Sequence, residues 1–230
     1  MEIRIESLLT GAREATGVVA IIDVFRAFST AAVALANGAS RIIMVSGVEE
    51  AFALRDSGTG HLVMGEVEGR PPDGFDLGNS PLEASRIDFT GKTIIQRTSA
   101  GTQGIAAASR AERLYASSLV TATATARGMR AGNPARVTLV AMGKNAVART
   151  DEDELCALHL RNLLEGRTGD RDAVRAVILA GGEAARFRDR ARPWLHPEDL
   201  EIALDIDRYD FAIRVMVEDG RPVGRMEKTA

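Results

Sequence analysis

Short runs of apolar, often β-branched residues alternate along this chain with alanine-rich stretches of helical periodicity. Several runs are apolar on both faces, which is typical of strands covered by helices on both sides. The pattern predicts strands at Ile3–Ile5, Val18–Val24, Arg41–Val45, Leu62–Met64, Thr93–Gln96, Arg113–Tyr115 and Val137–Met142. It predicts helices between them at Arg26–Ala36, Val48–Asp56, Pro81–Ser85, Gln103–Arg110 and Leu119–Ala131. This alternation indicates an α/β fold with three layers, α/β/α, around a largely parallel or mixed sheet.

The second half of the chain is more helical. Helices are predicted from Thr150 to Leu164, at Asp172–Leu179 and at Glu198–Leu204, and the tail reads as two strands around a turn at Asp219-Gly220. The polar stretch Gly166–Asp172 suits a loop. We therefore predict a single domain over residues 1–230, with two intimate lobes divided near residues 166–172 as the alternative.

Composition excludes several classes of protein. The chain has 230 residues, 45% of them hydrophobic and 27% charged, which is ordinary for a globular domain. A net charge of −3 and the lack of a basic stripe argue against a nucleic-acid partner. No apolar run reaches the roughly 18 residues of a membrane span, and the N-terminus has no secretory signal. We expect a soluble, cytoplasmic protein without a membrane partner.

The segment GFDLGNSP, residues 74–81, combines a carboxylate, an amide, a hydroxyl and two glycines. Pro81 is favoured at the first position of a helix, and a helix N-terminus offers unpaired N–H groups and the positive end of the dipole. Such an end binds anions. The carboxylate of Asp76 beside it suggests a metal ion that bridges acid and anion. The segment therefore predicts phosphate chemistry, with Asn79 and Ser80 as candidates for substrate binding.

An apolar strand delivers Asp23 near its end, and Arg26, Ser29 and Thr30 follow at the start of the next helix. In open α/β sheets, ligands bind beyond the carboxyl ends of the strands. Asp23 is a candidate for a magnesium ligand or for a nucleophile that accepts the phosphoryl group, and Arg26 for a clamp on an anion. The structural alternative is that Asp23 caps the helix and pairs with Arg26.

Two further acids are candidates for a site with oxygen ligands, which magnesium prefers. Glu66 follows the strand Leu62–Met64, and Asp76 lies in GFDLGNSP. Together with Asp23 they are the predicted ligands of Mg²⁺. The alternative makes Glu66 a solvated strand end and Asp76 a turn residue.

A third strand runs into Thr98, Ser99, Gly101 and Thr102 before the next helix. Hydroxyl groups and a glycine at a helix N-terminus can cradle an oxyanion, although simple N-capping explains them equally. Neither a GxxxxGK[ST] loop nor a GxGxxG fingerprint is present, which argues against a nucleotide or dinucleotide site.

A fourth cluster follows the strand Val137–Met142, where Glu152 and Asp153 open the next helix. The helix dipole alone favours acids there, but either one can bind a metal or water. The single cysteine, Cys156, suits the core and excludes an internal disulfide. Because no histidine has a visible partner, nucleophilic hydrolase triads are disfavoured.

Taken in order, these clusters resemble the 2-phosphosulfolactate phosphatase family, also called ComB-like. The resemblance covers nearly the whole chain, and GFDLGNSP is its most specific part. The other motifs that carry it are IDVFRAFST (residues 22–30), ALANGA (34–39), Gly65-Glu66, TSAGT (98–102) and EDELCA (152–157).

The resemblance implies a magnesium-dependent phosphatase that hydrolyses 2-phospho-3-sulfolactate to 3-sulfolactate and phosphate, in coenzyme M biosynthesis. Its matching positions lead to our hypothesis for the site. The candidates for catalysis are Asp23, Arg26 and Asp153; for substrate binding Ser29, Thr30, Asn79, Ser80, Thr98, Ser99, Gly101 and Thr102; and for Mg²⁺ Asp23, Glu66 and Asp76. A carboxylate, Asp23 or Asp153, either activates water or attacks the phosphoryl group directly.

Two positions depart from the family pattern. Val67 stands where a basic residue is common, and Ala100 where an amide is common. An anion site that lacks an arginine loses a charge-assisted hydrogen bond. The alternatives are therefore a phosphatase of a different phosphate monoester and a non-catalytic anion-binding protein on the same fold. A homodimer through the C-terminal hairpin and the helices of the second half is a further open possibility.

Overall fold

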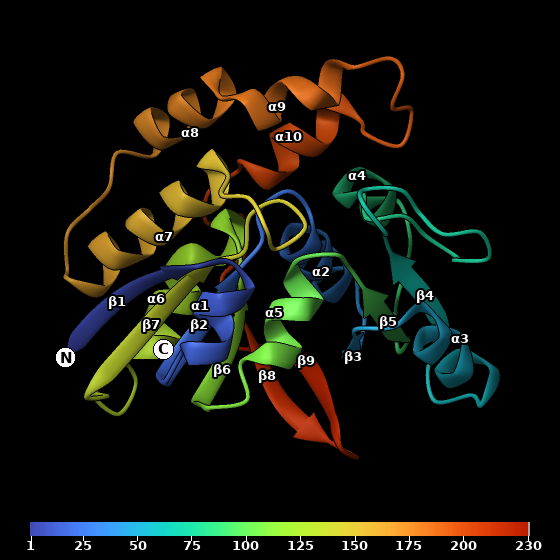
Figure 1. The fold of residues 1–230 in the computed structure, drawn as a ribbon, viewed down its shortest axis with the longest axis horizontal. Helices are drawn as coiled ribbons and strands as arrows, with labels where there is room; N and C mark the ends of the chain where they lie inside the picture. Colours follow the sequence, from blue (N-terminus) through green and yellow to red (C-terminus); the bar gives the residue numbers. More distant parts are fainter. Residues whose placement is uncertain (230) are drawn as a thin grey trace.

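Nine strands form one mixed sheet in the computed structural model, which describes residues 1–229 (Figure 1). Their order across the sheet is β1-β7-β2-β6-β8-β9-β3-β5-β4. The strands are β1 (Glu2–Ser7), β2 (Gly17–Ile22), β3 (Arg41–Val45), β4 (Leu62–Gly65), β5 (Thr93–Arg97), β6 (Ala111–Ser117), β7 (Arg136–Ala141), β8 (Ala212–Glu218) and β9 (Arg221–Glu227). Helices pack on both faces, so the predicted α/β fold is confirmed.

The C-terminal hairpin joins two parallel halves of this sheet. β1, β7, β2 and β6 run parallel to one another in one half, and β3, β5 and β4 run parallel to one another in the other half. β8 pairs antiparallel with β6, and β9 pairs antiparallel with β3. The hairpin turns at Asp219 and Gly220, whose φ angles of 50° and 76° suit the predicted two-residue turn. The alternation of residues predicts the hairpin, but it does not place the hairpin in the middle of the sheet.

Two layers of helices explain why the strands are apolar on both faces. One layer contains α1 (Leu8–Glu14), α2 (Ala27–Ala36), α4 (Pro81–Ser85) and α5 (Gly101–Ala107). The other contains α3 (Val48–Asp56), α6 (Ala122–Arg130), which follows the 3₁₀ turn η1 (Leu119–Thr121), and α7 (Asp151–Leu164). Side chains along a strand alternate between the layers, so Ile21 packs with the first and Ile22 with the second.

A third group of helices lies along the top of Figure 1. It consists of α8 (Arg171–Ala180), α9 (Gly182–Ala185), the 3₁₀ turn η2 (Arg186–Arg188) and α10 (Pro197–Ala203). We call residues 171–203 the cover. α8 packs on α7, and α10 packs on α4 and α2. The cover has a small apolar cluster of its own, in which Phe187, Leu195 and Leu200 are buried.

The pattern predicts neither α1 nor α9. With seven and four residues, these helices are too short to show a helical period. α5 begins at Gly101, before the predicted Gln103, because Thr98 and Thr102 close the preceding turn with mutual backbone-to-hydroxyl hydrogen bonds of 2.9 and 3.0 Å. No helix within residues 1–229 is long and apolar enough to cross a membrane.

His159 on α7 is buried, with 2% of its surface exposed, and neither ring nitrogen has a hydrogen-bond partner within residues 1–229. A Cβ atom added to Gly169 would lie 2.7 Å from Nδ1, so this loop packs directly on the ring. Burial lowers the pKa of His159 below its usual 6.5; the charge of Arg171 adds to this effect, and that of Asp207 opposes it.

We predict that His159→Leu becomes more stable relative to the wild type as the pH falls below about 6.5. The unfolded wild-type chain takes up a proton there that the folded protein resists, so the wild type loses stability and the variant is spared that loss. Urea unfolding at pH 7.5 and pH 5.5 measures this difference. The control is His61→Gln, at an exposed position. A stability difference for His159→Leu that does not change with pH would contradict the prediction.

Candidate functional site

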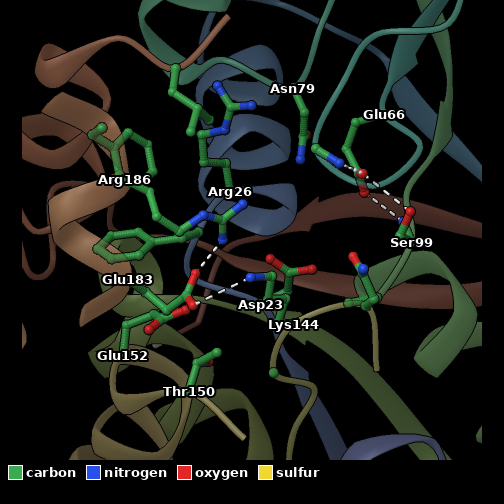
Figure 2. Close-up of a pocket in the computed structure, with 17 residues that line it drawn as sticks. Asp23, Arg26, Glu66, Asn79, Ser99, Lys144, Thr150, Glu152, Glu183 and Arg186 are labelled. Atoms are coloured by element: carbon green, nitrogen blue, oxygen red, sulfur yellow. Dashed lines mark hydrogen bonds and ion pairs between the residues drawn. The ribbon is translucent and has the colours of Figure 1, made fainter. Parts of the chain in front are cut away.

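A polar pocket lies at the carboxyl ends of the strands, between the strand-end loops and the cover (Figure 2). It is lined by Asp23, Phe25, Arg26, Glu66, Gly69, Asn79, Ser99, Ala100, Gly143, Lys144, Asn145, Thr150, Glu152, Glu183, Arg186, Phe187 and Leu195. These residues come from the loops after β2, β4, β5 and β7, from the start of α7 and from the cover. The four polar clusters that follow predicted strands therefore meet in one place.

Asp23 follows the last residue of β2, a strand that is buried along its whole length. Its Oδ1 accepts a hydrogen bond from the backbone N–H of Ala27 (3.0 Å), at the start of α2. Its Oδ2 accepts one from Gly101 (2.9 Å), at the start of α5. The burial of the carboxyl group raises its pKa to about 7, and the charge of Glu66 adds to the rise, while the two N–H groups and Arg26 oppose it. Asp23 thus changes its charge near neutral pH.

Arg26 precedes α2 and is 4% exposed. Its Nη1 donates hydrogen bonds to Oδ2 of Asp199 (2.8 Å) and to the carbonyl oxygen of Trp194 (2.9 Å), both in the cover. The guanidinium group also lies over the ring of Phe187, 5.9 Å from its centroid. The ion-pair partner of Arg26 is therefore Asp199 and not Asp23.

Glu66 and Ser99 form one wall of the pocket, and Figure 2 shows the hydrogen bonds that join them. Glu66 accepts from the backbone N–H groups of Gly69 and Ser99, at 2.5 Å each, and from the Ser99 hydroxyl at 3.1 Å. Glu66 is 7% exposed, so it is not a solvated strand end. Its carboxylate fixes the loop after β5 against the loop after β4.

The opposite wall carries two acidic and two basic side chains. Glu152 and Lys144 belong to the region after β7, whereas Glu183 and Arg186 belong to the cover. Glu183 pairs with Arg186 and, at 3.8 Å, with Lys144, as Figure 2 shows. The burial of Glu152 raises its pKa to about 7, and the charges of Glu183 and Asp23 contribute.

Several polar groups that line the pocket have no partner. Asn79 Oδ1, Thr150 Oγ1, Glu152 Oε2 and Arg186 Nε are buried and make no hydrogen bond within residues 1–229. Nearly all buried polar groups in native proteins are paired with protein, water or ligand. In Figure 2, the amide of Asn79 points toward the space that Arg26 and Asp23 border. Acceptors and donors without partners around one space indicate a polar ligand.

The structure brings five of the predicted site residues to the pocket: Asp23, Arg26, Glu66, Asn79 and Ser99. The other predicted substrate-binding residues are Ser29, Thr30, Ser80, Thr98, Gly101 and Thr102, and none of them lines it. Their polar groups are used within the protein. Ser29 donates to the carbonyl of Val24, and Thr30 to those of Arg26 and Asn79. These residues shape the loops that hold the pocket.

Asp153, the second predicted catalytic acid, lies behind the wall of the pocket. Its oxygens accept from the backbone N–H groups of Val24 (2.7 Å) and Gly143 (2.8 Å). It joins the loop after β2 to the loop after β7. Burial, together with the charges of Glu152 and Asp23, holds the pKa of Asp153 well above its usual value.

Asp76, the third predicted metal ligand, does not line the pocket. Its Oδ2 accepts from the backbone N–H of Val63 (2.8 Å) and pairs with Arg55 (3.4 Å) near the surface. Its position therefore matches the turn-residue alternative. Of the two departures from the family pattern, Ala100 borders the pocket, whereas Val67 lies outside the lining and is 37% exposed.

Sequence reasoning allowed Glu152 to bind a metal or water but left it out of the predicted site, and it did not select Lys144, Glu183 or Arg186. Glu152 had a signal, because it adjoins Asp153 in a cluster that follows a strand. Glu183 and Arg186 had none: they belong to the cover, whose place over the strand ends comes from tertiary packing.

The oxygen atoms of the pocket suit a hard divalent cation. Mg²⁺ is usually held by one or two carboxylates, with waters and the substrate phosphate as the remaining ligands. Asp23 and Glu152 both border the pocket, and Oε2 of Glu152 is free. No group of three or more His, Cys, Asp or Glu residues within the described chain forms a complete metal cluster. The donors therefore fit Mg²⁺ bound together with a phosphate.

Comparisons with known proteins identify the family of this chain. The sequence matches the model of the 2-phosphosulpholactate phosphatase family over residues 4–190. It is 31% identical over 204 residues to a probable 2-phosphosulfolactate phosphatase of Bacillus subtilis (strain 168), and the match covers 87% of each chain. It is also 37% identical over 150 residues to a protein of the same name from Thermotoga petrophila, which covers 65% of this chain and 64% of the relative. The chain belongs to the 2-phosphosulfolactate phosphatase family, a family of phosphoric monoester hydrolases.

Proposed function

We propose that this protein hydrolyses a small acidic phosphate monoester with the help of Mg²⁺, and that the substrate is 2-phospho-3-sulfolactate, which gives 3-sulfolactate and phosphate. The observation that carries the proposal is the buried Asp23 beside Arg26, in a pocket where four other buried polar atoms of the described residues lack partners. The names of the relatives support the choice of substrate.

The protein groups that bind the phosphoryl oxygens are Arg26 and the amide of Asn79, because the hydroxyl of Ser99 already donates to Glu66. They come from two different loops that the sheet and α2 hold in place. Groups fixed in this way stabilise the charge of a transition state without reorganisation during the reaction. Lys144 and Arg186 add positive charge on the opposite wall.

Asp23, Glu66 and Glu152 are the acids that would hold Mg²⁺. The ion would supply a Lewis acid that polarises the phosphoryl group. Asp76 lies outside the pocket, so it is not part of this set.

Asp23 is the carboxylate placed to activate water or to attack the phosphorus atom. The other candidate, Asp153, lies behind the wall and does not line the pocket, whereas Asp23 does. The two routes with Asp23 give the same products but differ in one intermediate. Direct attack forms an aspartyl-phosphate that acid quenching can trap, whereas activation of water forms no covalent intermediate. A role in coenzyme M biosynthesis, a cytoplasmic location and a homodimer stay predictions.

We predict that the purified protein releases inorganic phosphate from 2-phospho-3-sulfolactate in the presence of Mg²⁺. Turnover should fall to background in EDTA and return when Mg²⁺ is restored. Phospholactate and p-nitrophenyl phosphate test the alternative substrates. Turnover that EDTA leaves unchanged would contradict the magnesium requirement alone. No release from any of the three compounds, combined with tight phosphate binding, would indicate the anion-binding alternative.

A second prediction concerns Asp23 and Asp76. Asp23→Asn should lower kcat by roughly 10³-fold or more, because it removes the carboxylate that the proposal assigns to attack the phosphorus atom or to activate water. Asp76→Asn should keep most of the activity, since this carboxylate also accepts a backbone N–H but lies outside the pocket. Intact activity of Asp23→Asn would refute both roles of Asp23. Equal losses in the two variants would return Asp76 to the list of metal ligands.

A third prediction separates function from stability at Glu152. In EDTA, Glu152→Gln should gain stability over the wild type by about 2 kcal/mol between pH 5 and pH 8. The folded pKa of about 7 lies above the usual 4.5, so the wild type loses stability as the pH rises through this window, and glutamine does not. Turnover with Mg²⁺ should fall in the same variant.

Chemical unfolding at pH 5 and pH 8 measures this effect. Glu154→Gln, on the same helix but outside the pocket, is the matched control. A stability difference that is the same at both pH values would show that folding does not raise the pKa of Glu152.

A further inference from the structure

One carboxylate connects the cover to the pocket. Asp199 on α10 is completely buried and receives hydrogen bonds from two other elements. Arg26 Nη1 donates to its Oδ2 (2.8 Å), while the Ser80 hydroxyl (2.6 Å) and the Leu82 backbone N–H (3.1 Å) donate to its Oδ1. The backbone N–H of His196 also donates to it (3.3 Å). Asp199 therefore fixes the start of α2, the start of α4 and α10 against one another.

The geometry at Arg26 leaves part of its guanidinium free. Asp199 and the Trp194 carbonyl both take hydrogen bonds from Nη1. Within residues 1–229, Nε and Nη2 of Arg26 make no hydrogen bond, although Arg26 lines the pocket. Because a guanidinium group is planar, holding one of its nitrogens sets the direction of the others. The ion pair with Asp199 thus sets the direction in which Nε and Nη2 of Arg26 point.

Asp199 also acts on the segment GFDLGNSP. Ser80 directly follows Asn79, whose amide oxygen is one of the unpartnered atoms of the pocket. The hydrogen bonds from Ser80 and Leu82 hold this backbone beside the pocket. One carboxylate therefore fixes two pocket groups, Arg26 and Asn79, that belong to different loops.

A buried ion pair is not explained by stability. The side chains of Arg26 and Asp199 are 3% and 0% exposed, and removing two such charges from water costs about as much as their attraction returns. The pair also lies partly outside the segment that matches the family model, since Asp199 follows residue 190.

We propose that Asp199 is a positioning residue: it acts through Arg26 and Ser80 to hold the phosphoryl-binding groups toward Asp23. This inference rests on the proposed phosphatase function, but it also makes a statement about anion binding that needs no turnover. Asp199 does not touch the substrate.

The test begins with Asp199→Asn, which keeps the shape and removes the charge. We expect kcat/KM to fall roughly 10- to 100-fold, as for other partners that orient a binding group. Binding of inorganic phosphate, measured by calorimetry, should weaken by about tenfold for the same reason. Asp205→Asn, just beyond α10 in an exposed pair with Arg208, is the matched control and should change neither value.

Combination with Arg26→Lys distinguishes positioning from a purely structural role. If Asp199 acts through Arg26, Asp199→Asn should cost much less kcat/KM in the Arg26→Lys background than in the wild type. If the double variant lost kcat/KM by the full product of the two single losses, the two residues would act independently and the proposal would be overturned. Normal kcat, KM and phosphate affinity in folded Asp199→Asn would overturn it as well.

Should Asp199→Asn fail to fold, Ser80→Ala tests the same inference, since it removes the hydrogen bond to Asp199, together with the N-cap bond from Glu83, and leaves the ion pair. We expect it to raise KM and weaken phosphate binding while kcat stays within a fewfold of the wild type; unchanged values would overturn the link to GFDLGNSP. If the wild type shows no turnover but binds phosphate, weaker binding by the variants still supports the positioning role, and the proposed function alone fails.

Discussion

Two backbone N–H groups, from Ala27 and Gly101, hold the carboxylate of Asp23, and the rest of the site is arranged around that contact. β2 delivers Asp23 to the end of the sheet, while α2 and α5 direct their first N–H groups at its two oxygens. Because a carboxylate can be buried only with such partners, both helices must start at fixed places beside it. The positions of Arg26 and of the loop after β5 follow from this constraint.

The acids around Asp23 work against the stability of the fold. Burial and mutual repulsion raise the pKa values of Asp23, Glu152 and Asp153. A core that served stability alone would replace them with apolar residues. Their cost is reduced when a cation or a proton enters the pocket, so ligand binding and folding stability are coupled in this protein. That coupling is typical of sites in which charge is used for chemistry.

Local patterns predict most of the fold and five of the 17 residues that line the pocket. β2 and its terminal Asp23 are readable because a buried strand that ends in an acid has a short, regular signature. The ends of neighbouring parallel strands also meet at one edge, which brings Glu66 and Ser99 to the same place. Ser80 and Thr102 were placed in the pocket because hydroxyls suit both an anion and a helix cap. Only the hydrogen bonds in the structure separate the two uses: Ser80 bonds the distant Asp199, and Thr102 bonds Thr98 in the same turn.

Glu183 and Arg186 show what sequence patterns cannot supply. They belong to the cover, and its place over the strand ends depends on α8 packing against α7 and on α10 packing against α4. No short-range period encodes such contacts. If the phosphoryl group binds at the sheet edge as proposed, the cover faces the part of the substrate that lies beyond the phosphate. Differences in substrate among proteins with this sheet are accordingly expected in the cover and at Ala100, both of which border the pocket, more than at Val67, which does not.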